Sequence, residues 1–402
     1  MFRPHVCAFD SLKALSLCGL LAAALPAIAQ DATGIKQVRI ATGPTDSTDF
    51  PFGGLVGNAI SNPPGSRECD RGGNCGVPGL IAVAQTTGGA ADNLQAVVKG
   101  QVELGLTHAD IAEWAFRADG EFTGQPPQTR LRVVARLYPA TVHLFARRGA
   151  NIASIADLAG KRVALETESS GTRYTAKLIL SAHKVRWNRV QFRNLDIAAA
   201  GKAFAASELD ALFVVDGAPV LALEELSRNA PVDLVPIAGP TADKLVQVVS
   251  YYSRDVIPAG AYGNAADVPT IAVGAILIAR DDLDQDLSYG IAKAIWHERN
   301  AELFATGHPR GKLLDKSRAV AGIAMPVHPG AVRYYIEEKL MSQAPAIAPA
   351  EPSQPLPARP AAPRASRPAA PKAPPADAAP VTVPAPAAAE PPPAAASGPN
   401  TK

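Results

Sequence analysis

Small hydroxyl residues and glycines are concentrated at four points where a predicted strand gives way to a predicted helix. These junctions lie at 42–48, 86–89, 169–173 and 216–219. In an open α/β sheet, ligands bind beyond the carboxyl ends of the strands, where the next helix presents unpaired N–H groups and the positive end of its dipole. The four junctions together therefore predict a site for a small solute. Each one alone is equally consistent with ordinary helix caps and turns.

Patterns typical of catalysis begin in this sequence but are not completed. His297 and Glu298 start a zinc-protease pattern, but Ala301 stands where its second histidine belongs. The glycines of 307–313 are too closely spaced for a phosphate-binding loop, and no G-x-S-x-G motif occurs. The seven histidines form no cluster with metal-ligand spacing. We therefore predict a binding protein rather than an enzyme, with no cofactor and no metal.

The N-terminus has the features of a secretory signal peptide. Arg3 and Lys13 precede or flank an apolar stretch at 14–25 that is too short to span a bilayer, and an A-x-A site ends at Ala29. Cleavage is expected between Ala29 and Gln30, which makes residues 1–29 the signal and the mature protein periplasmic.

A lipoprotein acylated at Cys18 is the rival interpretation of this segment, although Leu17 is larger than the position before an acylated cysteine requires. After the signal, no apolar run reaches membrane length, so no transmembrane segment is expected in the mature chain. The formal net charge of +2 gives no electrostatic case for binding nucleic acid.

The two remaining cysteines, Cys69 and Cys75, lie in a glycine-rich stretch. In an oxidising compartment such a pair predicts a disulfide. Free thiols are the alternative. A metal site is the least favoured interpretation, because no histidine stands nearby in the sequence and two thiolates are too few ligands.

Short β-rich runs alternate with helical patterns along the mature chain. Strands are expected at 38–42, 80–86, 103–107, 131–137, 142–146, 161–165, 190–192, 209–215 and 270–279. Helices are expected after Pro51 and at 91–99, 154–160, 171–182, 198–206, 219–228 and 283–305. This alternation predicts an α/β fold with a parallel-type sheet, and 402 residues suffice for two lobes. From 344 to 402 the chain is nearly all proline and alanine, which predicts a disordered tail.

Specific motifs in a fixed order carry a resemblance to one family. They are Thr42-Gly43 with Thr48-Asp49-Phe50-Pro51-Phe52-Gly53-Gly54, Thr87-Gly88-Gly89-Ala90-Ala91-Asp92-Asn93-Leu94, Leu106-Thr107-His108-Ala109-Asp110-Ile111, Leu137-Tyr138-Pro139 with Val142-His143-Leu144, Ser170-Gly171-Thr172-Arg173, the run 210–217, the run 258–262, and Pro326-Val327-His328-Pro329-Gly330. From Val38 to about Glu338, this series resembles the TAXI-type solute receptors of TRAP transporters.

The resemblance implies a type II periplasmic binding protein fold, with two α/β lobes joined by two hinge strands near 143–147 and 275–279. Lobe 1 is expected at 30–143 and 276–343, and lobe 2 at 144–275. The implied ligand is a small anionic or zwitterionic solute, such as a carboxylate or an amino acid. It would be handed to the membrane subunits of a TRAP permease, which uses an ion gradient.

The expected ligand carboxylate sits at the start of the helix after Gly171, where Arg173 neutralises it. Residues of the other lobe then close over the same solute. The predicted ligand-binding residues are Thr42, Thr48, Phe50, Gly88, Gly89, His108, Ser170, Gly171, Thr172, Arg173 and Asp216.

The sequence departs from the family pattern at several of these places. Asp46 and Ser47 stand where glycines are usual, Asp216 replaces a glycine, and His108 replaces a glutamine. An aspartate facing the cleft would repel a second carboxylate or pair with an amino group. Two other functions remain open at this point: a ligand sensor of the same fold that signals to a membrane partner, and a secreted enzyme.

Overall fold

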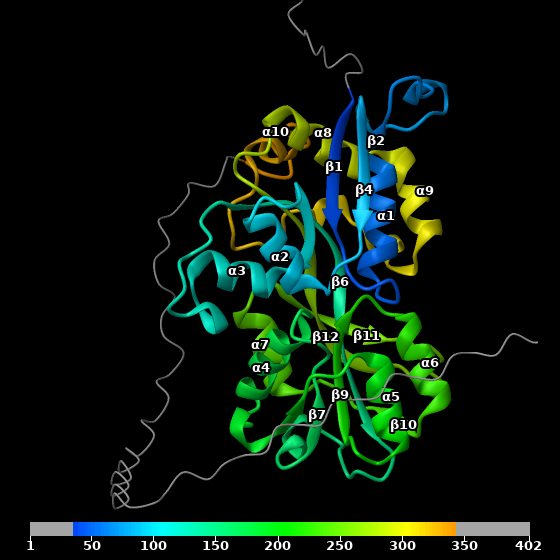
Figure 1. Cartoon of the computed structure of the whole chain (residues 1–402), viewed down its shortest axis with the longest axis vertical. Helices are drawn as coiled ribbons and strands as arrows, with labels where there is room; N and C mark the ends of the chain where they lie inside the picture. Colours follow the sequence, from blue (N-terminus) through cyan, green and yellow to red (C-terminus); the bar gives the residue numbers. More distant parts are fainter. Residues whose placement is uncertain (1–34, 343–402) are drawn as a thin grey trace, which may run out of the picture. The chain divides into compact units, whose positions relative to one another are not determined.

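Two long antiparallel strands, β6 (Leu131–Arg147) and β12 (Val268–Arg280), pair with each other along the centre of the protein (Figure 1). The structure is a computed structural model and describes residues 35–342. The predicted signal peptide and the predicted proline- and alanine-rich tail lie outside these residues.

The remaining strands and helices alternate along the chain, as the sequence predicted. The other strands are β1 (Lys36–Ala41), β2 (Ser61–Asn62), β3 (Val77–Pro78), β4 (Leu80–Gln85), β5 (Leu104–His108), β7 (Arg162–Ala164), β8 (Gln191–Arg193), β9 (Ala211–Asp216), β10 (Val232–Leu234) and β11 (Tyr252–Ile257). The helices are α1 (Asp49–Ile60), α2 (Ala90–Val98), α3 (Ala109–Arg117), α4 (Thr172–Ala182), α5 (Ile197–Ala205), α6 (Leu221–Asn229), α7 (Pro240–Val248), α8 (Gln285–Ile295), α9 (Glu298–Gly307) and α10 (Pro329–Glu337).

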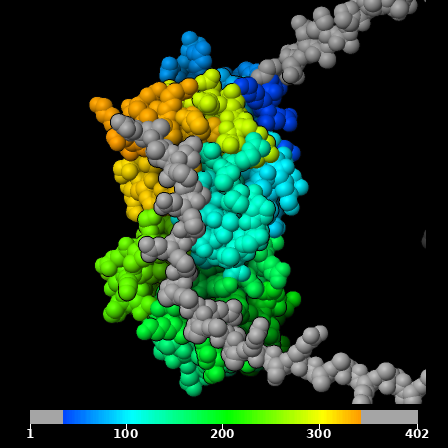
Figure 2. Space-filling view, turned by 90° about the vertical axis from the view of Figure 1, so that its left-hand side faces the viewer, coloured from blue at the N-terminus to red at the C-terminus, as the bar shows by residue number. Residues whose placement is uncertain are grey.

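The strands form one curled sheet that serves two lobes. The strand order is β3-β2-β4-β1-β5-β12-β6-β9-β7-β8, with β10 beside β6 and β11 beside β12. We call the part built on β1–β5, α1–α3 and α8–α10 the first lobe, and the part built on β7–β11 and α4–α7 the second lobe. Figure 2 shows the same division by colour, with both ends of the described chain in the upper part and its middle in the lower part.

The sheet is mixed rather than of the parallel type that the alternation predicted. β1, β4 and β5 are parallel, and so are β7, β8 and β9, but the central β6 and β12 are antiparallel to all of their partners. The sequence analysis predicted two separate strands, at 131–137 and 142–146, and proline is uncommon inside a central strand. β6 instead continues through Pro139, which pairs with Gly274 just before β9 joins at Thr141.

Both long strands change partners between the lobes. β6 pairs with β9 only from Thr141 onward, and β12 pairs with β11 up to Val273 and with β5 from Ala275 onward. The shift between neighbours therefore lies close to the two segments predicted as hinges. A hinge motion at these positions stays a proposal.

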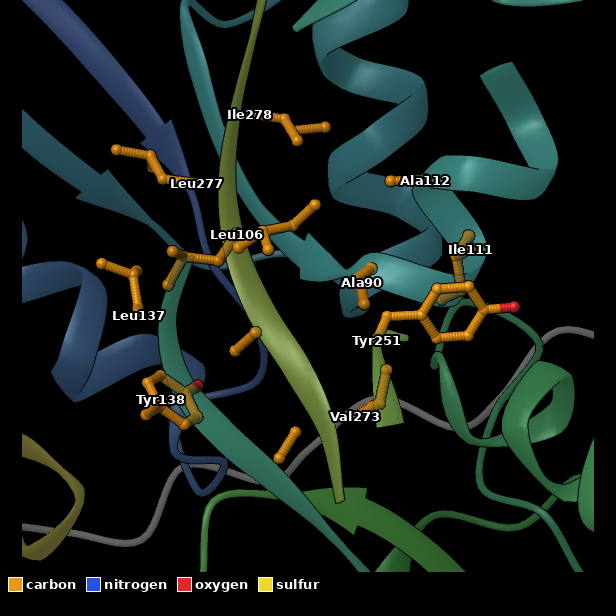
Figure 3. Packing of buried hydrophobic residues seen from close by; sticks show 14 of the residues in the cluster. Ala90, Leu106, Ile111, Ala112, Leu137, Tyr138, Tyr251, Val273, Leu277 and Ile278 are labelled. Carbon is orange, nitrogen blue, oxygen red and sulfur yellow. The ribbon is translucent and has the colours of Figure 1, made fainter. Parts of the chain in front are cut away.

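A hydrophobic core follows the central strands. Ten successive residues of β12 are buried, as expected for a strand covered on both faces. Figure 3 shows part of this core, with Leu106 of β5, Leu137 and Tyr138 of β6, and Leu277 and Ile278 of β12. Within the second lobe a separate cluster forms around Phe145, Phe204 and Tyr262. The main core also includes residues of the second lobe, such as Val163, Ile179 and Phe213, so one continuous interior supports the loops of both lobes.

The segment predicted as one helix over 283–305 is two helices. α8 ends at Ile295, and α9 starts at Glu298 with His297 as its N-cap, whose Nδ1 accepts a hydrogen bond from the Arg299 N–H. Before β4, the insert at 62–79 contains a disulfide between Cys69 and Cys75, as the cysteine pair predicted. Among the described residues, no helix has both the length and the apolar character needed to cross a bilayer.

Candidate functional site

A cavity of about 90 Å³ lies where the loops of the two lobes meet. Its walls come from the strand-to-helix junctions that the sequence singled out. The lining residues are Pro44, Asp46, Ser47, Asp49, Gly88, Gly89, Ala90, His108, Glu166, Thr167, Ser170, Gly171, Asp196, Ile197, Val215 and Asp216. This volume is enough for a small solute and too small for a macromolecular segment.

The charge of the lining is strongly one-sided. Five carboxyl side chains face the cavity, from Asp46, Asp49, Glu166, Asp196 and Asp216, and the lining contains no lysine or arginine. Several carboxylates in one enclosed space repel each other and favour either protonation or a bound cation.

The carboxyl groups of Asp216 and Asp49 lie close to each other at the boundary between the lobes. Asp216 ends β9 and accepts hydrogen bonds from the N–H of Thr48 (2.9 Å) and of Gly217 (2.7 Å). Burial, and then the neighbouring carboxylate of Asp49, raise the pKa of Asp216 well above its usual value. Burial also raises the pKa of Asp49, although His108 and the hydroxyl of Tyr138, which donates to Asp49, act in the opposite direction. Both acids hold protons more tightly than exposed aspartates do.

Glu166 is the third carboxyl group with a perturbed proton affinity. It accepts hydrogen bonds from Ser170 Oγ (2.9 Å) and from Thr172 Oγ1, and its backbone has the uncommon φ of 58°. Such a conformation is costly for a residue other than glycine and is held by its surroundings. Burial raises the pKa of Glu166 to about 7. At neutral pH this group is therefore balanced between its two protonation states.

The cavity lining also offers hydrogen-bond donors. His108 is 3% exposed, and its buried Nδ1 has no hydrogen-bond partner among the described residues. The helices α2 and α4 both begin at the cavity, behind Gly89 and Gly171. The N–H groups of Ala90 and Gly171 meet no acceptor in the described part of the chain. Helix N-termini of this kind stabilise a negative group.

Direct contacts hold the two lobes together around the cavity. Thr48 Oγ1 donates to the carbonyl oxygen of Gly217 (2.6 Å), and the Ala91 N–H donates to that of Ser169 (3.1 Å). Farther from the cavity, Asp110 of α3 accepts hydrogen bonds from Thr175 Oγ1 (2.6 Å) and the Tyr252 hydroxyl (2.9 Å). The structure is therefore a closed arrangement of the lobes.

Of the predicted ligand-binding residues, six line the cavity. They are Gly88, Gly89, His108, Ser170, Gly171 and Asp216. The other five are not part of the lining. Three of them have hydroxyl groups that bond elsewhere: Thr42 Oγ1 donates to the Gln85 carbonyl, Thr48 Oγ1 donates to the Gly217 carbonyl, and Thr172 Oγ1 accepts from the Val215 N–H. The remaining two are Phe50 and Arg173, and the Arg173 guanidinium lies 5.3 Å from the centre of the Trp187 ring.

The position of Arg173 changes the expected chemistry. The sequence interpretation used it to neutralise a ligand carboxylate, but it is not among the cavity residues and its charge rests on an aromatic face. Arg310 lies near the cavity and is also engaged, with its Nε donating to the Ala218 carbonyl (2.5 Å) and its Nη1 3.5 Å from Asp255. Among residues 35–342, no arginine lines the cavity where it could pair with an anionic solute.

Sequence reasoning missed Asp49, Glu166 and Asp196. Asp49 had one available signal, because it follows Thr48 in the first junction, and Asp196 had another, as the N-cap of α5 that accepts from the Ala199 N–H. Glu166 gave no signal, since only its unusual backbone conformation and its two hydroxyl partners bring it to the cavity.

The stability of the ligand-free protein is expected to fall as pH rises from about 4.5 to about 7. Because the pKa of Glu166 is higher in the folded than in the unfolded chain, its contribution is complete below the unfolded value and is lost as pH rises through the folded one. The loss is at most about 3 kcal/mol and is smaller where solvent screens the charge. Asp49 and Asp216 act in the same direction.

Denaturant unfolding at a series of pH values checks this expectation. Glu166→Gln should flatten the decline, whereas Glu168→Gln, a change at an exposed neighbour, should leave it in place. An equally steep decline in the Glu166→Gln protein would show that this carboxyl group is not the source.

Solved structures with a similar fold are binding components of import systems. They include the periplasmic aliphatic sulphonate-binding protein SsuA of Escherichia coli (13% identity, TM-score 0.41, covering 77% of this chain and 89% of that one). A putative sulfonate-binding protein of Methylobacillus flagellatus is 15% identical (TM-score 0.42, 77% and 90%). An amino acid ABC transporter substrate-binding protein of Streptococcus pneumoniae, bound to L-arginine, is 12% identical (TM-score 0.39, 69% and 95%).

The sequence itself matches a model of one protein family over most of the described chain. The match extends from residue 40 to residue 338 and so includes both lobes, both long strands and every cavity-lining residue. The chain belongs to the NMT1-like family.

Proposed function

We propose that this protein is an extracytoplasmic solute receptor that closes its two lobes around a small solute and delivers it to a membrane transporter. The observation that carries the proposal is the cavity between the lobes, lined by five carboxyl groups without a lysine or arginine and by His108, whose buried Nδ1 has no hydrogen-bond partner among the described residues. Buried polar groups in this state imply a partner, because leaving them unpaired is costly. The predicted signal peptide supports an extracytoplasmic location.

The solute that fits this cavity carries a positive charge. Five carboxyl groups and no lysine or arginine line the walls, so a purely anionic solute would meet repulsion on most sides. An ammonium group would pair with the carboxylates of Asp49, Asp216 and Glu166 and would offset the burial that raises their pKa values, together with the repulsion from Asp49 that raises the pKa of Asp216 further. The family pattern has glycines at positions 46 and 216. The carboxylates that replace them here would favour a solute with an ammonium group over a purely anionic one.

A zwitterion would use both kinds of group in the cavity. Its carboxylate suits the starts of α2 and α4, with the N–H groups of Ala90 and Gly171 and the ring of His108. Its ammonium group suits the carboxyl groups of the lining. An amino-acid-like solute is therefore the best match. The sequence predicted an anionic or a zwitterionic solute, and we propose the zwitterionic one.

The membrane partner is proposed as a TRAP-type permease. The support is the ordered series of motifs that resembles the TAXI-type receptors. Membership of the NMT1-like family does not by itself specify this type of receptor. Two of the solved structures named above, those from Methylobacillus flagellatus and Streptococcus pneumoniae, are described as parts of ABC transporters, and their likeness does not choose between the two transporter classes. In either case the receptor binds its solute without converting it.

Matched pairs of solutes test the proposed ligand class. Amino acids and their deaminated counterparts should be screened by thermal unfolding with the mature protein near pH 8, where the cavity carboxyl groups are most ionised. An amine-bearing solute at a hundred times its Kd adds roughly 2.7 kcal/mol of stability and so raises Tm by several degrees. Its deaminated counterpart should give no shift. Stabilisation by the deaminated member alone would overturn the ligand class.

A further inference from the structure

The disulfide in the insert has a histidine neighbour that the sequence separates from it by more than two hundred residues. The insert contacts the start of α9, where His297 Nε2 lies 3.7 Å from Cys69 Sγ. The two sulfur atoms and one imidazole nitrogen all lie within 4.8 Å of one another. The sequence analysis disfavoured a metal site because no histidine is near the cysteines in the sequence. In the folded protein His297 is near them.

The imidazole is oriented toward the sulfur by its own backbone contact. His297 Nδ1 accepts the Arg299 N–H at 3.3 Å, which leaves Nε2 on the side of Cys69. The Arg299 guanidinium donates to the carbonyl oxygen of Cys69 and fixes the insert to α9 at the same place. Because Nδ1 accepts this hydrogen bond, the proton of the neutral ring is on Nε2. Metal binding through Nε2 therefore requires that this proton move to Nδ1 and that the hydrogen bond from the Arg299 N–H break.

The distances fit two ligands of one soft metal ion. Zinc binds thiolate at about 2.3 Å and imidazole at about 2.0–2.1 Å, so in a tetrahedral site the sulfur and nitrogen are roughly 3.5 Å apart. The observed Cys69–His297 separation of 3.7 Å is close to this value. Only the second sulfur has to move, and it lies in a loop that includes Gly72 and Gly76.

We propose that reduction of the Cys69–Cys75 disulfide converts this place into a binding site for a thiophilic divalent cation of the zinc class, with His297 as the third ligand. A dithiol reductant gives up two electrons and two protons, becomes a disulfide, and leaves Cys69 and Cys75 as thiols. The metal then displaces both thiol protons, while the Nε2 proton of His297 is exchanged through water for one on Nδ1, which gives up the Arg299 N–H. The metal is bound by two thiolates and Nε2 of the neutral imidazole, with water in the fourth position. The three side chains are half-buried, so reductant and metal have access.

The disulfide and the metal are mutually exclusive cross-links. The disulfide closes a loop inside the insert over six residues, whereas the metal ties the insert to the start of α9. The same three side chains thereby report both the redox state and the metal supply. This inference is independent of the solute cavity.

Cobalt is a suitable probe, because thiolate-to-cobalt charge transfer gives an ultraviolet absorption band and zinc itself gives none. The full mature protein, reduced and freed of reductant without air, should bind one Co²⁺ per chain with this band, and Zn²⁺ should displace it. The oxidised protein should show no band. His297→Gln should weaken Co²⁺ binding at least about tenfold, because one of three protein ligands is lost.

His183→Gln is the matched control, since this histidine is also half-buried but its Nδ1 is bonded to the Ile179 carbonyl on α4. It should bind Co²⁺ as the unaltered protein does. Circular dichroism of each reduced variant confirms that the fold is retained. Absence of the band in the reduced protein, or equal affinity in the His297→Gln variant, would overturn the proposal.

Discussion

Asp216→Asn is expected to weaken binding of an amine-bearing solute by roughly 2–5 kcal/mol, because a buried ammonium loses a charged partner. The same change should make the ligand-free protein more stable at pH 8. Asp216 lies beside Asp49 in a buried place and must be kept protonated or repelled there, whereas asparagine carries no charge. Asparagine keeps one oxygen that can accept the Thr48 N–H but loses the acceptor of the Gly217 N–H, which makes the gain smaller than removal of the charge alone would give. Affinity and stability are thus expected to change in opposite directions.

Calorimetry of solute binding and of thermal unfolding measures both effects. The stability gain should disappear below about pH 4, where the unfolded chain is protonated as well. Asp286→Asn is the control, because it removes an exposed carboxylate paired with Arg333 and should change neither quantity by much. A variant that keeps full affinity, or that is less stable at pH 8, would contradict the role given to Asp216.

Gly171→Ala is expected to oppose closure of the lobes and to weaken solute binding by roughly 1–3 kcal/mol, the usual cost of forced overpacking. A Cβ at this position would lie 2.4 Å from His108 Nδ1 and 2.9 Å from Ile111 Cδ1, and both of these belong to the other lobe. The backbone of Gly171, with φ −74°, accepts alanine without strain. The penalty therefore applies to the closed arrangement and spares the folded lobes.

Titration calorimetry and small-angle scattering separate these effects. The variant should bind weakly and remain more extended than the unaltered protein when solute is added. Gly54→Ala, where a Cβ would meet nothing within 4 Å, provides the matched helix control and should bind normally. Normal affinity in the Gly171→Ala protein would mean that solute binding does not require this contact between the lobes.

The sequence predicted the parts of the site that depend on local signals. Gly88, Gly89, Ser170 and Gly171 stand at strand-to-helix junctions, which glycine and serine mark through turn and cap chemistry. Asp216 was notable because it replaces a glycine of the family pattern. These positions could be found because each is tied to the end of a strand, and strand ends meet at one edge of a sheet.

The remaining features depend on contacts between distant segments. Glu166 reaches the cavity through a left-handed backbone that no neighbouring residue signals. Arg173 lies in the first turn of α4, but its guanidinium contacts the ring of Trp187, which follows the helix, instead of lining the cavity. Two strands were predicted on either side of Pro139, yet pairing of Pro139 with Gly274 keeps β6 continuous. Local propensity cannot reveal such outcomes, because tertiary pairing overrides it.

The number of protons exchanged on solute binding tests whether the cavity binds an ammonium group. Titration calorimetry near pH 7, in two buffers of different ionisation enthalpy, measures it for the solute that stabilises the protein most. An ammonium group in the acidic cavity favours the ionised forms of Glu166, Asp49 and Asp216, so we predict that protons are released and that affinity rises with pH. Proton uptake, with affinity falling as pH rises, would show that the cavity receives an anion and would contradict the account.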